Sequence, residues 1–225
     1  KTLLIDNGSA YLNEIKRHIT EAATNVEGHS FEKLSIKEMK ALYDADKSEG
    51  KAKFGQYLSG FNYIVSTGSK DLRKYDKEVH KQIAEKAGDS VFLGVCHGAQ
   101  QYASANTVEL SKSDHMYQGE RDSEIREGHK DNEILEGVAK DGSMSKYGHH
   151  KLYLTPKQVE KSGSNLEVIA ESTHPNEHPE KGKKFVEMFK AKGKDHYGVQ
   201  FHPEKGDGAI IKNLFKLAYS KAKSS

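Results

Sequence analysis

Short runs of apolar residues alternate along this chain with longer segments in which apolar positions recur at helical spacing. The runs predict buried strands, and the periodic segments predict helices. Strands are predicted over Thr2 to Asp6, Asn62 to Ser66, Ser90 to Val95 and His196 to Phe201. Helices are predicted over Ala10 to Ala23, Asp71 to Lys86 and Gly208 to Lys221. This alternation favours an α/β fold with a mostly parallel, open sheet and helices on both faces.

Two further segments are polar rather than apolar. Asp44 to Gly55 is charged and contains glycine, so we expect a surface loop or a frayed helix there. Leu110 to Asn132 is polar and alternates over Ser123 to Arg126, which suggests a hairpin at the edge of the sheet. No internal repeat is visible, and we expect residues 1–225 to form a single domain.

Composition narrows the possible functions. The 225 residues include 35 basic and 33 acidic side chains, a net charge of +2, and the two signs are interspersed. Such a balance does not indicate nucleic-acid binding. The single cysteine excludes an intrachain disulfide, no run has the length and apolarity of a membrane span, and no signal-peptide pattern is seen. We therefore expect a cytoplasmic protein that does not bind a membrane.

The single cysteine, Cys96, lies in the turn Gly-Val-Cys-His-Gly. Asp89 to Val95 predicts a strand before this turn, and Ala99 to Ala105 predicts a helix after it. This is the arrangement of a nucleophile elbow, with sulfur in place of oxygen. A helix N-terminus aimed at the sulfur favours the thiolate. The simpler interpretation is a small buried cysteine at a strand end, but glycine on both sides favours a nucleophile.

A matching base lies near the C-terminus, in Tyr-Gly-Val-Gln-Phe-His-Pro-Glu. A strand leads into His202, Pro203 restricts the backbone, and Glu204 can orient the imidazole. Cys96, His202 and Glu204 are thus candidates for a catalytic triad. The same three letters recur at His178 to Glu180, but in a polar loop with no strand before it, so we prefer the later copy.

Both motifs resemble a known family. Gly94 to Gln100 and Tyr197 to Glu204 are similar to the nucleophile and histidine motifs of the class I glutamine amidotransferases. Leu3 to Gly8 is similar to the first strand and turn of the glutaminase subunit of guanosine monophosphate synthetase. The resemblance covers most of the chain and implies the flavodoxin-like α/β fold of that family.

The resemblance also implies where the oxyanion of the reaction is held. The family's turn Ser-Gly-Gly-Pro corresponds to Ser66 to Ser69, where Thr67 replaces the first glycine and Ser69 the proline. The expected backbone donors are therefore the amides of Gly68 and of His97, the residue after the nucleophile. The unusual turn leaves open whether the oxyanion hole is formed before a partner docks.

A second departure lies at Lys146 to Leu152, where the resemblance predicts a Ser-His followed by an acidic residue. The acidic residue is missing. By resemblance, this region holds the two ends of glutamine, and the implied substrate contacts are Gln100, Tyr147, Gly148, His149 and His150. Adjacent histidines on a strand point to opposite faces, so we predict no metal site here.

The activity implied is hydrolysis of the glutamine side-chain amide through a thioester on Cys96, with release of ammonia. The chain has no Walker-type phosphate loop, so ATP and Mg²⁺ are expected on a separate ATP-dependent synthetase subunit of the ATP pyrophosphatase kind, and no cofactor is expected in this chain. By the closest resemblance, the acceptor would be xanthosine monophosphate and the product guanosine monophosphate.

Two alternatives remain open. One is a stand-alone γ-glutamyl hydrolase or peptidase that uses the same three residues, motivated by the altered segment Tyr147 to His150. The other is a noncatalytic subunit that senses glutamine, against which the complete triad argues, because a binding module has no need of all three groups.

Overall fold

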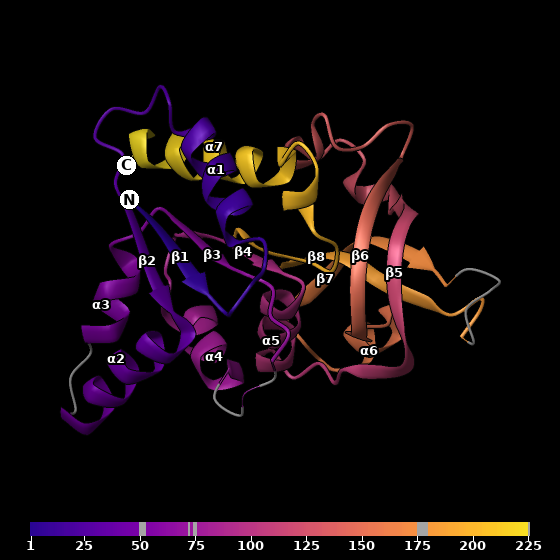
Figure 1. Cartoon of the computed structure of the whole chain (residues 1–225), viewed down its shortest axis with the longest axis horizontal. Coiled ribbons are helices and arrows are strands. Elements are labelled where there is room, and N and C mark those ends of the chain that lie inside the picture. The colour runs from indigo at the N-terminus through magenta and orange to yellow at the C-terminus, as the bar shows by residue number, and fades with distance from the viewer. Residues whose placement is uncertain (50–52, 72, 74–75, 175–179, 225) are drawn as a thin grey trace.

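The computed structural model describes residues 1–49, 53–71, 73, 76–174 and 180–224 of the chain. Its strands are β1 (Thr2–Asp6), β2 (Phe31–Ser35), β3 (Tyr63–Ser66), β4 (Val91–Val95), β5 (Ser111–Ile125), β6 (Ser143–Tyr153), β7 (Leu166–Thr173), β8 (Lys184–Ala191) and β9 (His196–Val199). Within the described residues they form one nine-stranded sheet in the order β2-β1-β3-β4-β9-β8-β7-β5-β6 (Figure 1).

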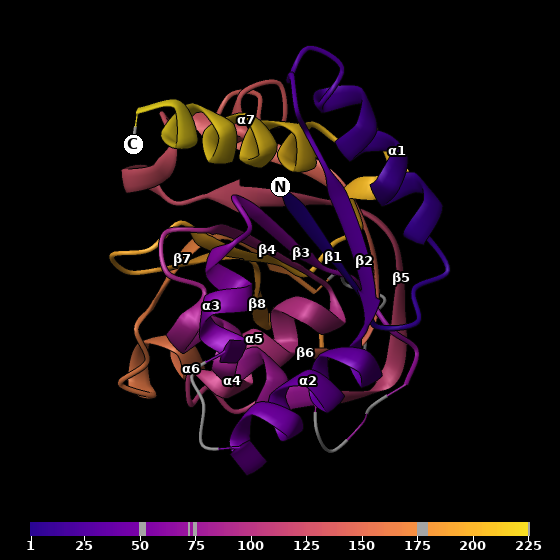
Figure 2. The same cartoon turned by 90° about the vertical axis from the view of Figure 1, so that its left-hand side faces the viewer.

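Helices cover both faces of this sheet. They are α1 (Leu12–Ala22), α2 (Ile36–Glu49), α3 (Lys53–Ser59), α4 (Asp76–Lys86), α5 (His97–Ala105), α6 (Pro156–Lys161) and α7 (Ala209–Ser224). Helices α1 and α7 lie on one face, and α2 to α5 lie on the other (Figures 1 and 2). Within the described part of the chain, no helix combines the length and apolar character needed to cross a membrane.

The α/β class predicted from the sequence is confirmed, and the sheet is mixed. Strands β2, β1, β3, β4 and β9 pair in parallel, and four of them are the predicted ones. The β9 strand ends at Val199, two residues before the predicted end. The carboxyl ends of parallel strands meet at one edge of a sheet, so the turns after β1, β3, β4 and β9 come together.

The remaining strands pair antiparallel and were not predicted individually. Strand β5 is a single long strand inside the segment expected to be a hairpin, and its hairpin partner is β6, at the sheet edge. The pairing shifts register between Lys112 and Tyr117, which marks a bulge in β5. The edge strand is thus β6, which was not predicted, whereas β5, from the segment expected at the edge, lies between β7 and β6.

The core shows why the parallel strands read as apolar runs. Leu4 and Val65 pack beneath α1 and α7, whereas Leu3 and Ile64 pack against the helices of the other face. A strand covered on both sides has no polar face. Asp44 to Gly55 was expected to be a surface loop or a frayed helix, and its described part is helical, because α2 runs to Glu49 and α3 starts at Lys53.

Candidate active site

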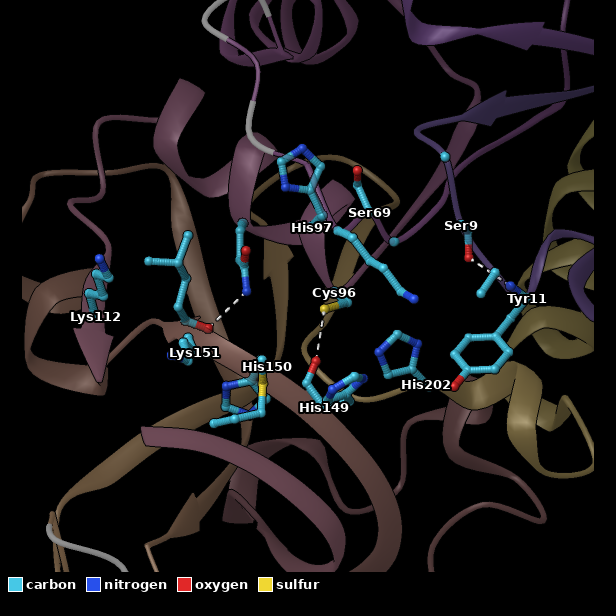
Figure 3. Close-up of a pocket in the computed structure, with 17 residues that line it drawn as sticks. Ser9, Tyr11, Ser69, Cys96, His97, Lys112, His149, His150, Lys151 and His202 are labelled. Atoms are coloured by element: carbon cyan, nitrogen blue, oxygen red, sulfur yellow. Dashed lines mark hydrogen bonds between the residues drawn. The ribbon is translucent and has the colours of Figure 1, made fainter. Parts of the chain in front are cut away.

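Cys96 lies between β4 and α5 in a sharp turn. Its φ of 48° and ψ of −102° are rare for a residue with a side chain and represent strain that surrounding contacts must hold. A Cβ at Gly98 would overlap the carbonyl of Ser66, and one at Gly94 would lie 2.7 Å from the Ala99 nitrogen. The two glycines thus allow the close approach that the elbow requires. The Cys96 side chain faces a pocket and is nearly buried (Figure 3).

His202 and Glu204 follow β9, and the turn Pro203–Lys205 places them side by side. The Nδ1–H of His202 donates to Oε1 of Glu204 over 2.8 Å, and the carboxylate is 1 % exposed. This bond leaves Nε2 for the Cys96 side of the ring. Tyr11 packs edge-on against the imidazole, with ring centroids 5.4 Å apart.

The protonation of His202 follows from its neighbours. Burial alone would lower the pKa of His202, but hydrogen bonds to Cys96 and to Glu204, with the charges of both, raise it to about 10. The geometry therefore favours an imidazolium next to the sulfur, which is the arrangement that supports a thiolate nucleophile. The structure brings together all three predicted triad residues.

The residues of the two predicted oxyanion donors, Gly68 and His97, line the same pocket. A Cβ built on Gly68 would lie 3.4 Å from Cε1 of His202 and 3.8 Å from Cβ of Cys96, so this turn packs directly against both groups. His97 is the first residue of α5, and the N–H groups of a first turn have no acceptor within the helix. A backbone N–H at a helix N-terminus can stabilise an anion.

Two glutamines complete the surroundings of the sulfur. Nε2 of Gln200 donates to Sγ of Cys96 over 3.6 Å, and Nε2 of Gln100 donates to Oε1 of Gln200 over 3.1 Å. Nε2 of Gln100 also donates to the Leu152 carbonyl over 2.8 Å. Gln100 was predicted from the sequence, whereas Gln200 was missed, although it lies two residues before His202.

The pocket that contains Cys96 has a volume of about 540 Å³. Three lysines line it, Lys70, Lys112 and Lys151, and among the described lining residues no carboxylate is present. In the described part of the chain these lysines form no ion pair. The pocket therefore suits an anionic ligand group.

Of the four residues from Tyr147 to His150 that were expected to contact substrate, two line the pocket and two do not. His149 and His150 line the pocket, as Gln100 does. Burial lowers the pKa of His149 and lowers that of His150 well below its ordinary value, in the latter case with help from Arg121. Both imidazoles are therefore neutral near pH 7. In the described residues, no group of three or more His, Cys, Asp and Glu side chains could hold a metal ion.

Tyr147 and Gly148 do not line the pocket. The carbonyl of Tyr147 accepts from the backbone N–H of His202 over 2.9 Å, so this residue anchors the loop that carries the base. A side chain at Gly148 would overlap the guanidinium of Arg121, which pairs with the buried Glu187. The alternative motif cannot be compared with His202 in the same way, because His178 and Pro179 lie outside the described residues.

Comparison with known proteins agrees with this geometry. The family model described as "Glutamine amidotransferase class-I" matches residues 3–221. No curated protein matches the sequence.

Two solved structures share the fold at low identity. A protein from Thermoplasma acidophilum that is assigned to GMP synthase as one of its subunits is 18% identical, with a TM-score of 0.68, and the match covers 99% of this chain and 95% of that one. The glutaminase domain of Trypanosoma brucei CTPS with bound acivicin is 17% identical, with a TM-score of 0.71, covering 98% and 93%.

Proposed function

The chain belongs to the class-I glutamine amidotransferase family, and from this premise we propose that it is a glutaminase subunit that hydrolyses the glutamine side-chain amide and passes ammonia to a separate ATP-dependent synthetase. The observation that carries the proposal is the convergence of Cys96, the His202–Glu204 pair and the amides of Gly68 and His97 on one pocket. The cytoplasm is the compartment we expect for such a subunit.

The reaction follows from these groups. The Cys96 thiolate attacks the amide carbon, the carbonyl electrons move onto oxygen, and the amides of Gly68 and His97 stabilise the oxyanion. The His202 imidazolium gives its proton to the nitrogen as the carbon–nitrogen bond breaks, so that ammonia and a thioester form. His202, now neutral, takes a proton from water, which attacks the thioester and releases glutamate and the thiolate. Glu204 stabilises the imidazolium in both steps.

The proposed partner follows from the fate of ammonia. Free ammonia is protonated in water, so a synthetase subunit that binds ATP, Mg²⁺ and the acceptor has to receive it directly. We propose xanthosine monophosphate as the acceptor, on the strength of the resemblance of Leu3 to Gly8 to guanosine monophosphate synthetase.

The test is release of ammonia and glutamate from glutamine by the purified chain, alone and with a synthetase subunit from the same genome. We expect activity that rises with the partner, requires Cys96 and yields guanosine monophosphate when xanthosine monophosphate and ATP are present. The synthetase supplied with ammonium chloride is the control, because it should form product without this chain. Equal activity of Cys96→Ala and wild type would overturn the proposal.

A second candidate function, γ-glutamyl hydrolase, is favoured by one observation. The pocket carries Lys70, Lys112 and Lys151 without a lining carboxylate among the described residues, and a γ-glutamyl peptide that ends in further carboxylates would match this charge. Comparing kcat/KM for glutamine with that for γ-glutamyl-glutamate separates the two functions. A preference for the peptide, with no stimulation by a synthetase, would support the hydrolase.

A further inference from the structure

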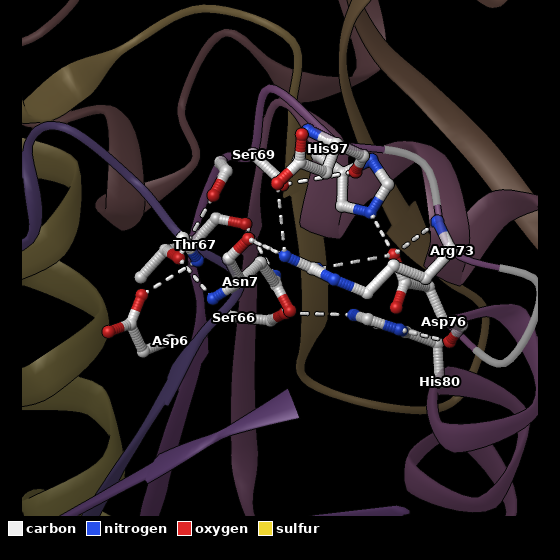
Figure 4. A network of polar contacts seen from close by, with 12 residues as sticks. Asp6, Asn7, Ser66, Thr67, Ser69, Arg73, Asp76, His80 and His97 are labelled. Carbon is white, nitrogen blue, oxygen red and sulfur yellow. Dashed lines mark hydrogen bonds and ion pairs between the residues drawn. The ribbon is translucent and has the colours of Figure 1, made fainter. Parts of the chain in front are cut away.

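Two polar side chains of helix α4, Asp76 and His80, are fully buried and lie one helical turn apart (Figure 4). Both are 0 % exposed, and neither lines the pocket that contains Cys96. A buried carboxylate is costly unless it is paired and hydrogen-bonded. The hydrogen-bond partners of the Asp76 carboxylate therefore indicate which groups it positions.

The Asp76 carboxylate contacts the turn that carries Cys96, through His97. Its Oδ2 lies 2.7 Å from Nε2 of His97, which donates to it. The His97 side chain is nearly buried, and the backbone N–H of the same residue is the proposed oxyanion donor next to Cys96. The carboxylate therefore fixes the residue whose amide has to point at the reacting oxygen.

His80 contacts the turn that contains Gly68, through Ser66. Its Nδ1 lies 2.7 Å from the Asp76 carbonyl and so donates a proton to it, which makes Nε2 the acceptor for the Ser66 hydroxyl 2.8 Å away. Burial lowers the pKa of His80 to about 4, so the ring stays neutral, as this acceptor role requires. Ser66 is the last residue of β3 and opens the turn that contains Gly68.

Asn7 extends the contact into the turn. Its Nδ2 donates to Oγ of Ser66 over 2.9 Å and to the Thr67 carbonyl over 2.6 Å. The hydroxyl of Thr67 accepts from the backbone N–H of Asn7 over 3.0 Å and donates to the Gly68 carbonyl over 3.1 Å. The threonine that replaces the family's first glycine thus ties the Gly68 peptide to the network.

Arg73 links Asn7 to Asp76. Its guanidinium donates twice to the Asn7 carbonyl, each time over 3.2 Å, and lies 3.8 Å from Oδ2 of Asp76. Its backbone N–H also donates to that oxygen, over 3.3 Å. Both halves of the proposed oxyanion hole are therefore connected through Asp76, whose carboxylate contacts His97 and Arg73 and whose backbone carbonyl contacts His80.

From this arrangement we infer that Asp76 is a positioning residue that fixes the Gly68 and His97 amides relative to each other. The inference rests on the proposed function, since it concerns the oxyanion of that reaction. The hydrogen bonds that link Asp76 to Asn7 and Thr67 hold the turn that contains Gly68 in place. It acts on the amides and does not touch the sulfur.

The test compares two reactions of Cys96 in Asp76→Asn. Hydrolysis of glutamine passes through an oxyanion, whereas alkylation by iodoacetamide displaces iodide and forms none. A misplacement of about 1 Å can lower a rate about 10²-fold, so we expect kcat to fall about 10- to 100-fold. KM and the alkylation rate should stay within about twofold, because the pocket and the thiolate–imidazolium pair are untouched.

Asp46→Asn is the matched control, because Asp46 is also a buried helix-terminal carboxylate, accepting from the amides of Lys53 and Phe54 away from the site. It should leave kcat unchanged. Equal losses of hydrolysis and alkylation in Asp76→Asn, or no loss of either, would overturn the inference. If Asp76→Asn does not fold, His97→Asn removes the same contact, keeps the backbone amide and carries the same expectation.

Wild-type activity decides the proposed function separately. A wild-type chain that hydrolyses neither glutamine nor γ-glutamyl-glutamate would overturn that function, and the inference with it. A chain that hydrolyses either substrate allows the comparison of kcat with alkylation to be made on that substrate.

Discussion

The parallel and antiparallel halves of the sheet contribute different things to the pocket. From the parallel half come the groups that would carry the chemistry, on short turns after β1, β3, β4 and β9, where backbone geometry and glycines set the positions. From the antiparallel half come Lys112, His149, His150 and Lys151, side chains of β5 and β6 that form a wall. The contrast suggests that reaction type and substrate choice are set by separate parts of the molecule.

If this division holds, changes in the parallel half alter kcat most. In Glu204→Gln the imidazolium loses its carboxylate partner, and kcat should fall about 10²- to 10⁴-fold, as in other enzymes whose histidine loses its acidic partner. Steady-state glutaminase assays measure the loss. Glu180→Gln is the matched control from the repeated His-Pro-Glu motif, and its activity should stay within about twofold of wild type. A larger loss in Glu180→Gln than in Glu204→Gln would show that His178 to Glu180, and not His202 to Glu204, is the functional copy of the motif.

The ionisation of His202 is a second test of the parallel half. Its folded pKa of about 10 lies above the value of about 6.5 for an unfolded histidine. The pair with Cys96 and Glu204 therefore contributes stability that is fully present below about pH 6.5 and is lost as pH rises through about 10. NMR of the His202 ring, assigned against His202→Asn, should show protonation at pH 8.

Removing the sulfur sharpens this test. In Cys96→Ala the pKa of His202 should fall, because the hydrogen bond and charge of Cys96 that help to raise it are gone. A wild-type ring that titrates near 6.5 would contradict the thiolate–imidazolium arrangement.

Changes in the antiparallel wall should act on binding instead. Lys112→Gln and Lys151→Gln each remove a cation from the pocket, and we expect KM for an anionic substrate to rise about 2- to 5-fold with kcat nearly unchanged, as for loss of one exposed charge contact. Lys157→Gln on α6, which does not line the pocket, is the control. If either lysine variant lowers kcat without changing KM, the antiparallel half also contributes to the chemical step, which contradicts the proposed division.

The smallest expected effect concerns Gly148. Because a Cβ there would overlap the Arg121 guanidinium, Gly148→Ala should lower the free energy of unfolding by about 1–3 kcal/mol. Denaturant unfolding measures this, and Gly128→Ala is the control, since nothing lies within 4 Å of a Cβ at that position. An unchanged stability with a raised KM would return Gly148 to the substrate-contact role that the family resemblance implies.

The sequence was most informative where structure is local. Strands buried on both faces read as apolar runs, and the glycines around Cys96 and the proline between His202 and Glu204 mark turns within a few residues. The antiparallel strands were missed because charged residues interrupt their pattern. Glu187 in β8, for example, is fully buried yet pairs with Arg121 on β5, 66 residues away.

The polar network was missed for a related reason. Asn7 follows β1, Ser66 ends β3 and Asp76 begins α4, and each is an ordinary polar residue in its own segment. The only local signal was the pair Asp76 and His80, polar residues at i and i+4 within an otherwise amphipathic helix. The parallel pairing of β1 with β3 brings Asn7 and Ser66 together, and Arg73 and His80 link them to Asp76.

The most direct measurement is mass spectrometry of the chain quenched in acid within one turnover after mixing with glutamine. A covalent thioester predicts a γ-glutamyl adduct that maps to the peptide containing Cys96, that decays as glutamate appears, and that is absent in Cys96→Ala. Glutamate release without any adduct, undiminished in Cys96→Ala, would contradict nucleophilic catalysis by this cysteine.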